Sequence, residues 1–367
     1  MKTLVRLSAL GLSLAFLLTG SWTGGGATAA TSREARIKHR GTPPPPAPPS
    51  DPGPWTVVAD SGWFVELSSP PAAEAEPTDE AAYIGALQDE KRAFRTAARS
   101  AGIQFRERRS FDILWNGLAI DVEPRHVLKL SRLPGVTALY PIGTTDAPEP
   151  ILAVEPPQFT PELFTAITMT HADQAQASGW TGRGIRVAVM DTGIDYNHPD
   201  LGGGFGPGFR VVGGFDFVGD DYTGGSQNIK PDPDPMDCGG HGTHVAGILA
   251  GNGQVRGVAP EATLRAYRVF GCSGPTSNDV MLAAMESVLA DGNQVLNMSI
   301  GAAFQWPQHP LARASNNLVN RGVVVVASAG NSGAAGLYSI SAPGAGAKVI
   351  AAASVDNARV HSPAVEF

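Results

Sequence analysis

The sequence predicts an α/β protein whose larger part is a parallel sheet covered by helices on both faces, preceded by a small α+β domain. From Trp180 onward, short apolar strands alternate with helices, as a sheet buried on both faces requires. Residues 63–140 instead follow the order β-α-β-β-α-β, and proline-rich stretches separate the parts. The chain has 367 residues, of which 43% are hydrophobic and 17% charged, as expected for a folded protein of about two domains.

The N-terminal residues predict an exported protein. Residues 1–30 have the form of a secretory signal: Lys2 and Arg6 are basic, residues 7–18 are mostly apolar, and small residues end the segment. The apolar run is short for a membrane anchor, which needs roughly 20 residues, although an anchor remains the alternative. Ser21 stands where a lipoprotein needs cysteine. We therefore expect secretion, with no membrane attachment once the signal is removed.

Residues 31–54 are a proline-rich spacer, because proline fixes an extended backbone and removes hydrogen-bond donors. Residues 55–141 form the small domain, with a turn expected at Asn116-Gly117 and a helix that begins at Pro124. Its expected strands are 63–67, 104–111, 118–122 and 136–140, and its expected helices are 81–101 and 124–133. Residues 142–170 are a linker with the processing region, since five prolines and three glutamates occur between 142 and 162.

Residues 171–367 form the larger domain. The expected strands are 185–191, 210–217, 262–270, 295–298, 323–329 and 348–353, and the expected helices are 241–251, 277–290 and 310–321. Sites in such sheets gather at the carboxyl ends of the strands. Asp191, Ser299 and Asn331 all follow strand ends, so we expect these three segments to converge.

Asp191 and His241 are the strongest candidates for chemistry. Asp191 ends a buried strand and precedes Thr192-Gly193, where a carboxylate can hold a neighbouring imidazole in one tautomer. His241 follows two glycines at an expected helix start. An aspartate that orients an imidazole, and a histidine that takes a proton from a hydroxyl, are two of the three parts of a serine-hydrolase triad. Taken alone, Asp191 is equally compatible with a turn or a helix cap.

His244 raises an alternative, because His241 and His244 could together bind a metal ion. The motif lacks the helical glutamate of a metallohydrolase, and no other histidine or cysteine has a comparable context. We therefore expect no metal and no cofactor, and His244 as a packed or hydrogen-bonded residue. The net charge of −7 gives no reason to expect a nucleic-acid partner.

Three further features surround the expected site. Asn331 lies on a glycine loop after a strand, where its amide can donate to an oxyanion or stabilise its own turn. Ser299, Ile300 and Gly301 form a segment of small residues that can pair with an extended peptide, or a simple loop. Cys238 and Cys272 flank the histidine motif. In an exported protein we expect them to form a disulfide, with two free thiols as the alternative.

The order and surroundings of these residues resemble those of a subtilisin-like serine protease, a subtilase of peptidase family S8. The resemblance covers residues 180–355 and is carried by Val187–Gly193, by His241–Gly247 and by the loop around Asn331. It implies that Asp191 orients His241, that His241 is the general base and that Asn331 supplies the oxyanion donor. It further implies that residues 299–301 line a cleft for polypeptide substrates.

Residues 63–141 resemble the propeptide of that family, a ferredoxin-like domain that is inhibitor and folding chaperone at once. The matching segments are Asn116–Val122, Leu133–Val136 and Tyr140-Pro141. The resemblance implies a zymogen whose propeptide inhibits the catalytic domain within the same chain.

The chain departs from the family at the nucleophile. The family places its serine in a Gly-Thr-Ser-Met-Ala type of segment, which this sequence lacks, and Ser354 and Ser362 have no such flanks. Residues 348–357 resemble the point where lactocepin-like subtilases insert a protease-associated domain. We therefore expect a C-terminally truncated, N-terminal portion that is inactive alone. The alternatives are a non-catalytic peptide-binding protein and the metallohydrolase described above.

The tight calcium loop of the family is also missing. Only residues 252–257 connect the histidine helix to the next strand, so we expect no calcium there. Asp200 matches a calcium-ligand position of the family, but without the loop we expect it to be a turn residue.

Overall fold

A computed structural model describes residues 62–150, 163–225 and 227–355. The expected signal at 1–30 and the spacer at 31–54 lie outside the described residues. Within them, no helix has the length and apolar character needed to cross a bilayer.

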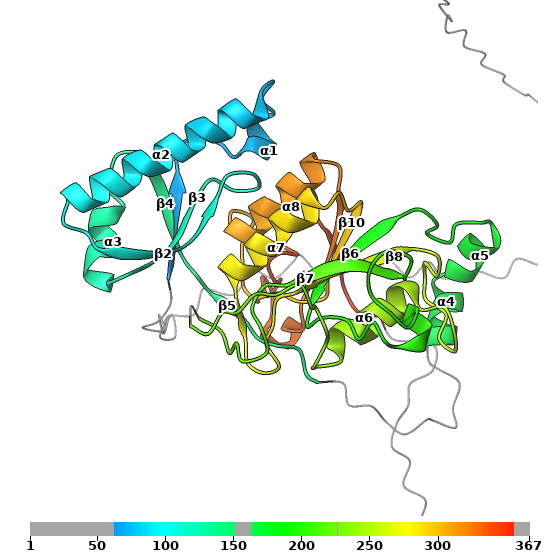
Figure 1. The fold of residues 1–367 in the computed structure, drawn as a ribbon. Helices are drawn as coiled ribbons and strands as arrows, with labels where there is room; N and C mark the ends of the chain where they lie inside the picture. The colour runs from blue at the N-terminus through cyan, green and yellow to red at the C-terminus, as the bar shows by residue number, and fades with distance from the viewer. Residues whose placement is uncertain (1–61, 151–162, 226, 356–367) are drawn as a thin grey trace, which may run out of the picture. The chain divides into compact units, whose positions relative to one another are not determined.

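The larger part is built on a six-stranded sheet in the order β12-β11-β10-β6-β8-β7, with every neighbouring pair parallel (Figure 1). Its strands are β6 (Arg186–Asp191), β7 (Val211–Asp216), β8 (Thr263–Arg268), β10 (Val295–Met298), β11 (Val324–Ser328) and β12 (Ile350–Ala352). Three helices follow strands of this sheet: α6 (His241–Ala250), α7 (Asn278–Ala290) and α8 (Pro310–Asn320).

The helices cover both faces of this sheet because side chains alternate along each strand. Val187 and Val189 of β6 pack in a cluster with Val245 and Ala246 of α6. The intervening Ala188 and Met190 belong to a second cluster, which contains the buried residues of α7 and α8. Figure 1 shows α6 on one side of the sheet and α7 and α8 on the other. The predicted parallel sheet with helices on both faces is therefore confirmed.

The small domain contains a four-stranded antiparallel sheet in the order β2-β3-β1-β4. Its strands are β1 (Trp63–Leu67), β2 (Phe105–Phe111), β3 (Gly117–Val122) and β4 (Val136–Pro141), and its helices are α1 (Ala72–Ala75), α2 (Glu80–Ser100) and α3 (Pro124–Leu130). Buried residues of α2 and α3 pack against one face of this sheet. Phe64 and Ala119, on the opposite face, belong to the same hydrophobic cluster as α7 and α8.

The turn expected at Asn116-Gly117 is wrong. Gly117 is the first residue of β3 and pairs with Phe111, so the connection from β2 spans residues 112–116. The Asn116 side chain is buried: its amide donates to the Ser69 carbonyl oxygen and to Glu90, and its oxygen accepts from Lys91. These long-range hydrogen bonds override the local preference for a tight turn.

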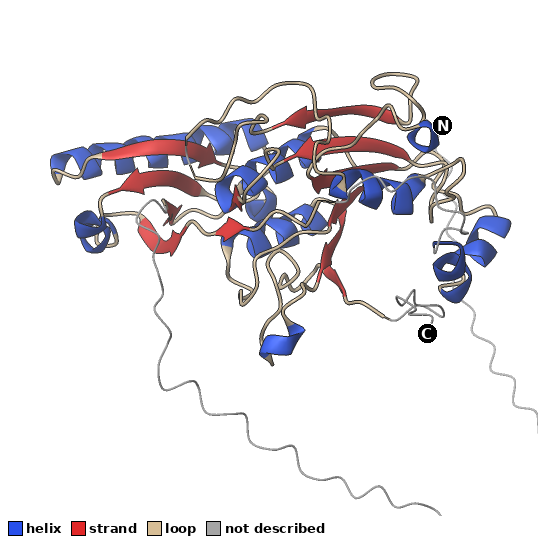
Figure 2. Cartoon of the chain, turned by 90° about the horizontal axis from the view of Figure 1, so that it is seen from below, coloured by secondary structure: helices blue, strands red, loops and turns tan. Residues whose placement is uncertain are grey.

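Two other boundaries differ from the expectation. Helix α3 ends at Leu130 rather than Leu133, because the residue before Pro134 is disfavoured in helical conformation. Residues 142–170 are not all linker. They contain β5 (Thr144–Thr145), which pairs antiparallel with β9 (Thr276–Ser277), and α4 (Leu163–Met169); α5 (Ala172–Ala177) follows (Figure 1). Figure 2 shows the helices and strands of the chain from below.

Gly117→Ala should destabilise the small domain. A Cβ there would overlap the Val65 carbonyl oxygen and approach the Trp115 ring at 2.6 Å, so β1 and β3 would have to separate. Overpacking of this kind costs about 1–3 kcal/mol. The matched control is Gly85→Ala in α2, where nothing lies within 4 Å of the added Cβ, and which should stabilise the helix by up to ~1 kcal/mol. Urea unfolding measures both; equal effects of the two variants would contradict the packing described here.

Candidate active site

Asp191 and His241 lie within hydrogen-bond distance although 50 positions separate them. His241 Nδ1 donates to Asp191 Oδ1 at 2.7 Å. Asp191 is the last residue of β6 and His241 the first of α6, so the pair forms where a strand end meets a helix start. The Asp191 side chain is fully buried and that of His241 is 21% exposed. The imidazole thus has one edge toward the carboxylate while part of the ring remains accessible.

The protonation of this pair reflects its surroundings. The hydrogen bond that His241 donates to Asp191 raises the pKa of His241 above 6.5, with burial acting in the opposite direction. Burial raises the pKa of Asp191, while the hydrogen bonds from His241 and from the Thr192 backbone N–H oppose that rise. Oδ2 of Asp191 is buried and has no hydrogen-bond partner among the described residues.

The close approach of α6 to Asp191 depends on two neighbouring residues. Thr192 Oγ1 accepts from the backbone N–H of Gly242 at 2.9 Å, which joins the strand exit to the first turn of α6. At Gly242, a Cβ would overlap the Gly193 carbonyl oxygen and lie 3.1 Å from the Asp191 Cβ. Thr192 was not singled out from the sequence; the signal available was a hydroxyl residue directly after the strand-ending aspartate.

Ser299, Ile300 and Gly301 directly follow β10, the neighbour of β6 in the sheet. Asn297 Nδ2 donates to Ser299 Oγ at 3.0 Å, and Ile300 is buried. Behind the segment, residues 302 and 342 exchange two backbone hydrogen bonds, and a Cβ on Gly301 would lie 2.7 Å from the Ala342 carbonyl oxygen. This segment is therefore held against residues 341–342.

Asn331 lies on the exposed loop beyond β11, the next strand of the sheet. Because β6, β10 and β11 are parallel neighbours, their carboxyl ends lie at the same edge. The loops that follow them carry the candidate residues Asp191, Ser299 and Asn331. The described contacts join Asp191 to His241 directly, and they include none between Asn331 and that pair.

Cys238 and Cys272 form a disulfide with a Cα–Cα distance of 5.4 Å. It links the loop before α6 to the loop after β8. Arg268 Nη2 lies 3.2 Å from Cys238 Sγ and 3.4 Å from Cys272 Sγ. Asp220 and these cysteines are the one group of three possible metal ligands among the described residues, and the two sulfur atoms are bonded to each other.

His244 differs from its expected packed position. It is exposed on α6, because the buried stripe of this helix runs through Val245, Ala246 and Ala250. Asp200 lies in the 3₁₀ turn Pro199–Leu201, and its carboxylate accepts from the backbone N–H groups of Gln254 and Val255 at 3.0 and 2.8 Å. This carboxylate therefore orders the short connection after α6.

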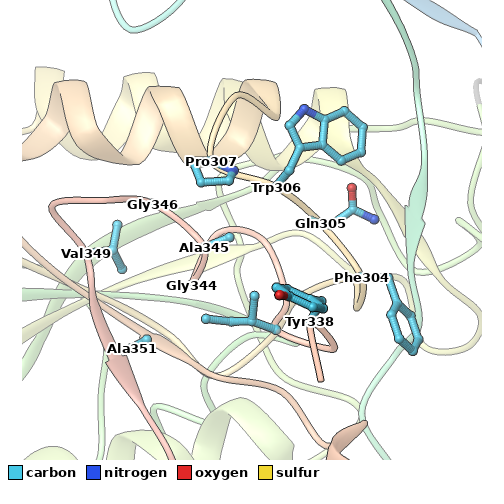
Figure 3. A pocket seen from close by; sticks show the side chains of 11 residues that line it. Phe304, Gln305, Trp306, Pro307, Tyr338, Gly344, Ala345, Gly346, Val349 and Ala351 are labelled. Carbon is cyan, nitrogen blue, oxygen red and sulfur yellow. The ribbon is translucent and has the colours of Figure 1, made fainter. Parts of the chain in front are cut away.

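An open pocket of about 670 Å³ lies beside these loops but contains none of the candidate residues. Phe304 and Trp306 come from the loop after β10, Tyr338 from the loop after β11, and Val349 and Ala351 from the entry to β12 and the strand itself (Figure 3). Its lining is mostly apolar.

Gly242→Ala should disrupt the Asp191–His241 contact. The added Cβ forces α6 away from Gly193, which lengthens the hydrogen bond and lowers the pKa of His241. The fold should lose about 1–3 kcal/mol. Gly247→Ala, in the same helix but with nothing within 4 Å, should gain up to ~1 kcal/mol and leave that pKa unchanged. NMR titration of His241 and urea unfolding distinguish the two; an unchanged pKa in Gly242→Ala would contradict the packing argument.

The contribution of His241 to stability should decline as the pH rises. Its pKa in the folded state is above the ordinary histidine value of 6.5, so folding favours the protonated imidazole. The contribution is fully present below pH 6.5 and is lost as pH rises through the folded-state pKa. The difference in unfolding free energy between the wild type and His241→Gln, measured in urea, should therefore shrink over this range.

His309 should have the opposite pH dependence. Burial lowers the pKa of His309 to about 4, so its contribution to stability is lost as pH falls from 6.5 toward 4.

The sequence of this chain is similar to that of known proteins. Residues 182–364 match the model of the Subtilase family, Peptidase_S8. The minor extracellular protease Vpr of Bacillus subtilis is 33% identical over 78% of this chain and 35% of its own length. Subtilisin Savinase of Lederbergia lenta is 37% identical over 52% of this chain and 62% of its own length. The chain thus spans less than two thirds of these relatives.

The crystal structure of the epidermin leader peptide processing serine protease of Staphylococcus aureus has the same fold. Its TM-score is 0.52 at 22% identity, over 74% of this chain and 60% of that one. The parallel sheet covered by helices agrees with the family match. Residues 182–364 of this chain therefore belong to a subtilase-family domain, homologous to serine proteases of peptidase family S8.

Proposed function

We propose that the chain is the N-terminal portion of a secreted subtilisin-like serine endopeptidase zymogen. The observation that carries this proposal is the 2.7 Å hydrogen bond from His241 Nδ1 to the buried Asp191 carboxylate. It assigns the proton to Nδ1, which leaves Nε2 as the nitrogen that can accept a proton from a hydroxyl. Asp191 then orients His241 and stabilises the imidazolium that forms during the reaction.

The remaining groups have roles in substrate binding and charge stabilisation. The Asn331 amide, on its exposed loop, donates to the oxyanion that develops on the scissile carbonyl. Residues 299–301 are backed by residues 341–342 and offer their other edge to an extended polypeptide. The nucleophile is a serine that these 367 residues do not supply, so the chain by itself binds peptides without hydrolysing them. Relatives named as proteases, one of them extracellular, support this reading.

The domain at 55–141 acts as the propeptide, a ferredoxin-like intramolecular inhibitor. Its contacts with the larger domain support this role. Glu286 of α7 accepts hydrogen bonds from the backbone N–H groups of Ile113 and Leu114, both at 3.1 Å. Asn317 of α8 donates to the Leu114 carbonyl oxygen at 2.9 Å. Ion pairs add to this interface: Arg313–Glu66, Arg321–Glu80 and Arg109–Asp279.

The hydrolytic proposal is tested with a fluorophosphonate probe. The isolated chain should remain unlabelled and should not cleave casein. The product of the same gene extended through whatever reading frame continues after Phe367 should be labelled on a serine and should cleave casein. Replacement of His241 by alanine in that product should abolish both. Labelling of a serine within the 367 residues would contradict the proposed absence of the nucleophile, and an unlabelled extended product would favour a peptide-binding protein without hydrolytic activity.

Attachment of the propeptide domain should weaken as the pH rises from 4.5 to about 7. Burial raises the pKa of Glu286 to about 7 from the ordinary 4.5, so the attached state retains a proton that the separated state loses over this range. Glu286→Gln should abolish this dependence. The measurement is the fraction of residues 62–150 that stays bound after cleavage at a protease site engineered between 151 and 162. Asp89→Asn, which removes an exposed charge paired with Arg92 on α2, is the control and should keep the wild-type dependence.

A further inference from the structure

Asp237 lies four residues before His241 and accepts four hydrogen bonds. Its Oδ1 accepts from the backbone N–H groups of Gly239 and Gly240 at 2.8 and 2.9 Å. Its Oδ2 accepts from the backbone N–H of Thr243 at 3.0 Å and from Thr243 Oγ1 at 2.6 Å. A single carboxylate thus orders both the loop before α6 and the first turn of the helix.

These bonds replace an ordinary helix cap. The N-cap position of α6 is Gly240, which has a left-handed backbone (φ 80°) and no side chain that could accept a hydrogen bond. The first amides of a helix need partners outside the helix. The amide of Gly242 donates to Thr192 Oγ1, and the amide of Thr243 donates to Asp237. The helix start that carries His241 is therefore held by the side chains of Thr192 and Asp237, and not by that of the cap residue.

The same carboxylate is connected to the strand exit that carries Asp191. Thr243 Oγ1 donates to Asp237 and accepts from the backbone N–H of Asp195 at 2.8 Å. The backbone N–H of Ile194 donates to the Pro235 carbonyl oxygen at 3.0 Å. The loop at 235–237 is thus joined to the residues that directly follow Gly193. Movement of Asp237 would displace the two halves of the Asp191–His241 pair relative to each other.

The charge of Asp237 acts on the imidazole. In the described residues, no lysine or arginine forms an ion pair with it, unlike Asp216, whose carboxylate pairs with Arg268 at 3.1 Å. The charged and titratable groups that act on His241 are Asp191 from β6, Asp237 from the preceding loop and His244 from α6. After the hydrogen bond with Asp191 and the opposing burial, the charges of Asp191 and Asp237 further raise the pKa of His241.

We propose that Asp237 is a positioning residue for His241: it holds the start of α6 against the exit of β6, and its uncompensated charge stabilises the imidazolium that forms when His241 accepts a proton. This inference rests on the proposed function, because an imidazolium forms in the reaction only if His241 is a general base. The positioning itself can be measured on the 367-residue chain, without any hydrolysis.

The test is an NMR pH titration of His241 in Asp237→Asn. Asparagine keeps one oxygen for Gly239 and Gly240 but removes the charge, so the pKa of His241 should decrease. Asp232→Asn is the matched control: it removes an exposed carboxylate from the same loop, and it should leave that pKa at the wild-type value. Equal pKa values in Asp237→Asn and the wild type, or an equal decrease in the control, would overturn the proposal.

The variant Thr243→Val tests the positioning role of Asp237 separately from its charge. It also provides a second test if Asp237→Asn fails to fold. Valine removes the hydroxyl that joins Asp237 to Asp195 but retains the carboxylate. The amide of Asp195 should exchange with solvent about fivefold faster, as loss of one hydrogen bond of ~1 kcal/mol implies. The pKa of His241 should decrease less than in Asp237→Asn; a larger decrease would overturn the assignment of the electrostatic effect to Asp237.

In the extended, hydrolytically competent product, Asp237→Asn should also move the acid limb of the kcat/KM profile to lower pH, because a weaker base loses its proton at lower pH. If no extended product hydrolyses peptides, the proposed function fails while the NMR result still decides the positioning role. If hydrolysis occurs and its acid limb does not move, the role of Asp237 fails and the proposed function stands.

Discussion

The hydrogen bond between a fully buried carboxylate and a partly exposed imidazole is the interaction on which the arrangement of this site depends. A buried carboxylate is costly unless hydrogen bonds stabilise its charge. Asp191 receives them from His241 and from the backbone of Thr192 on one oxygen, and the other oxygen has no partner among the described residues. The exposed part of the His241 ring is therefore available for the proton transfer proposed above.

This contact requires the helix and the strand to approach more closely than most side chains permit. Gly242 allows the approach because a Cβ would overlap the Gly193 carbonyl oxygen, and Thr192 and Asp237 provide the partners that the helix start lacks. The disulfide joins the loop immediately before α6 to the loop after β8, the strand that pairs with β6. The neighbourhood of His241 is thus stabilised covalently, by hydrogen bonds and by steric fit.

The small domain and the larger domain are joined by buried contacts that are both apolar and polar. Apolar residues from one face of the antiparallel sheet join the cluster of α7 and α8, and Glu286 receives two backbone hydrogen bonds from the other domain. Under the proposed function, this combination would make an inhibitory interface stable in the intact chain and sensitive to the protonation of one carboxyl group.

The sequence by itself determined the class of fold, because the alternation of apolar strands with helices leaves few architectures other than a covered parallel sheet. The strand end at Asp191 and the helix start at His241 were also evident, since local glycines and a buried strand specify them. Tertiary structure alone decided what depends on contacts between distant segments. The buried hydrogen bonds of Asn116 replace a turn that its local sequence favours, the pairing of β5 with β9 orders part of the expected linker, and the capping of Gly242 by Thr192 arises only where the exit of β6 meets the start of α6. Local patterns report backbone preference and burial, whereas these features are set by partners that no short stretch of sequence contains.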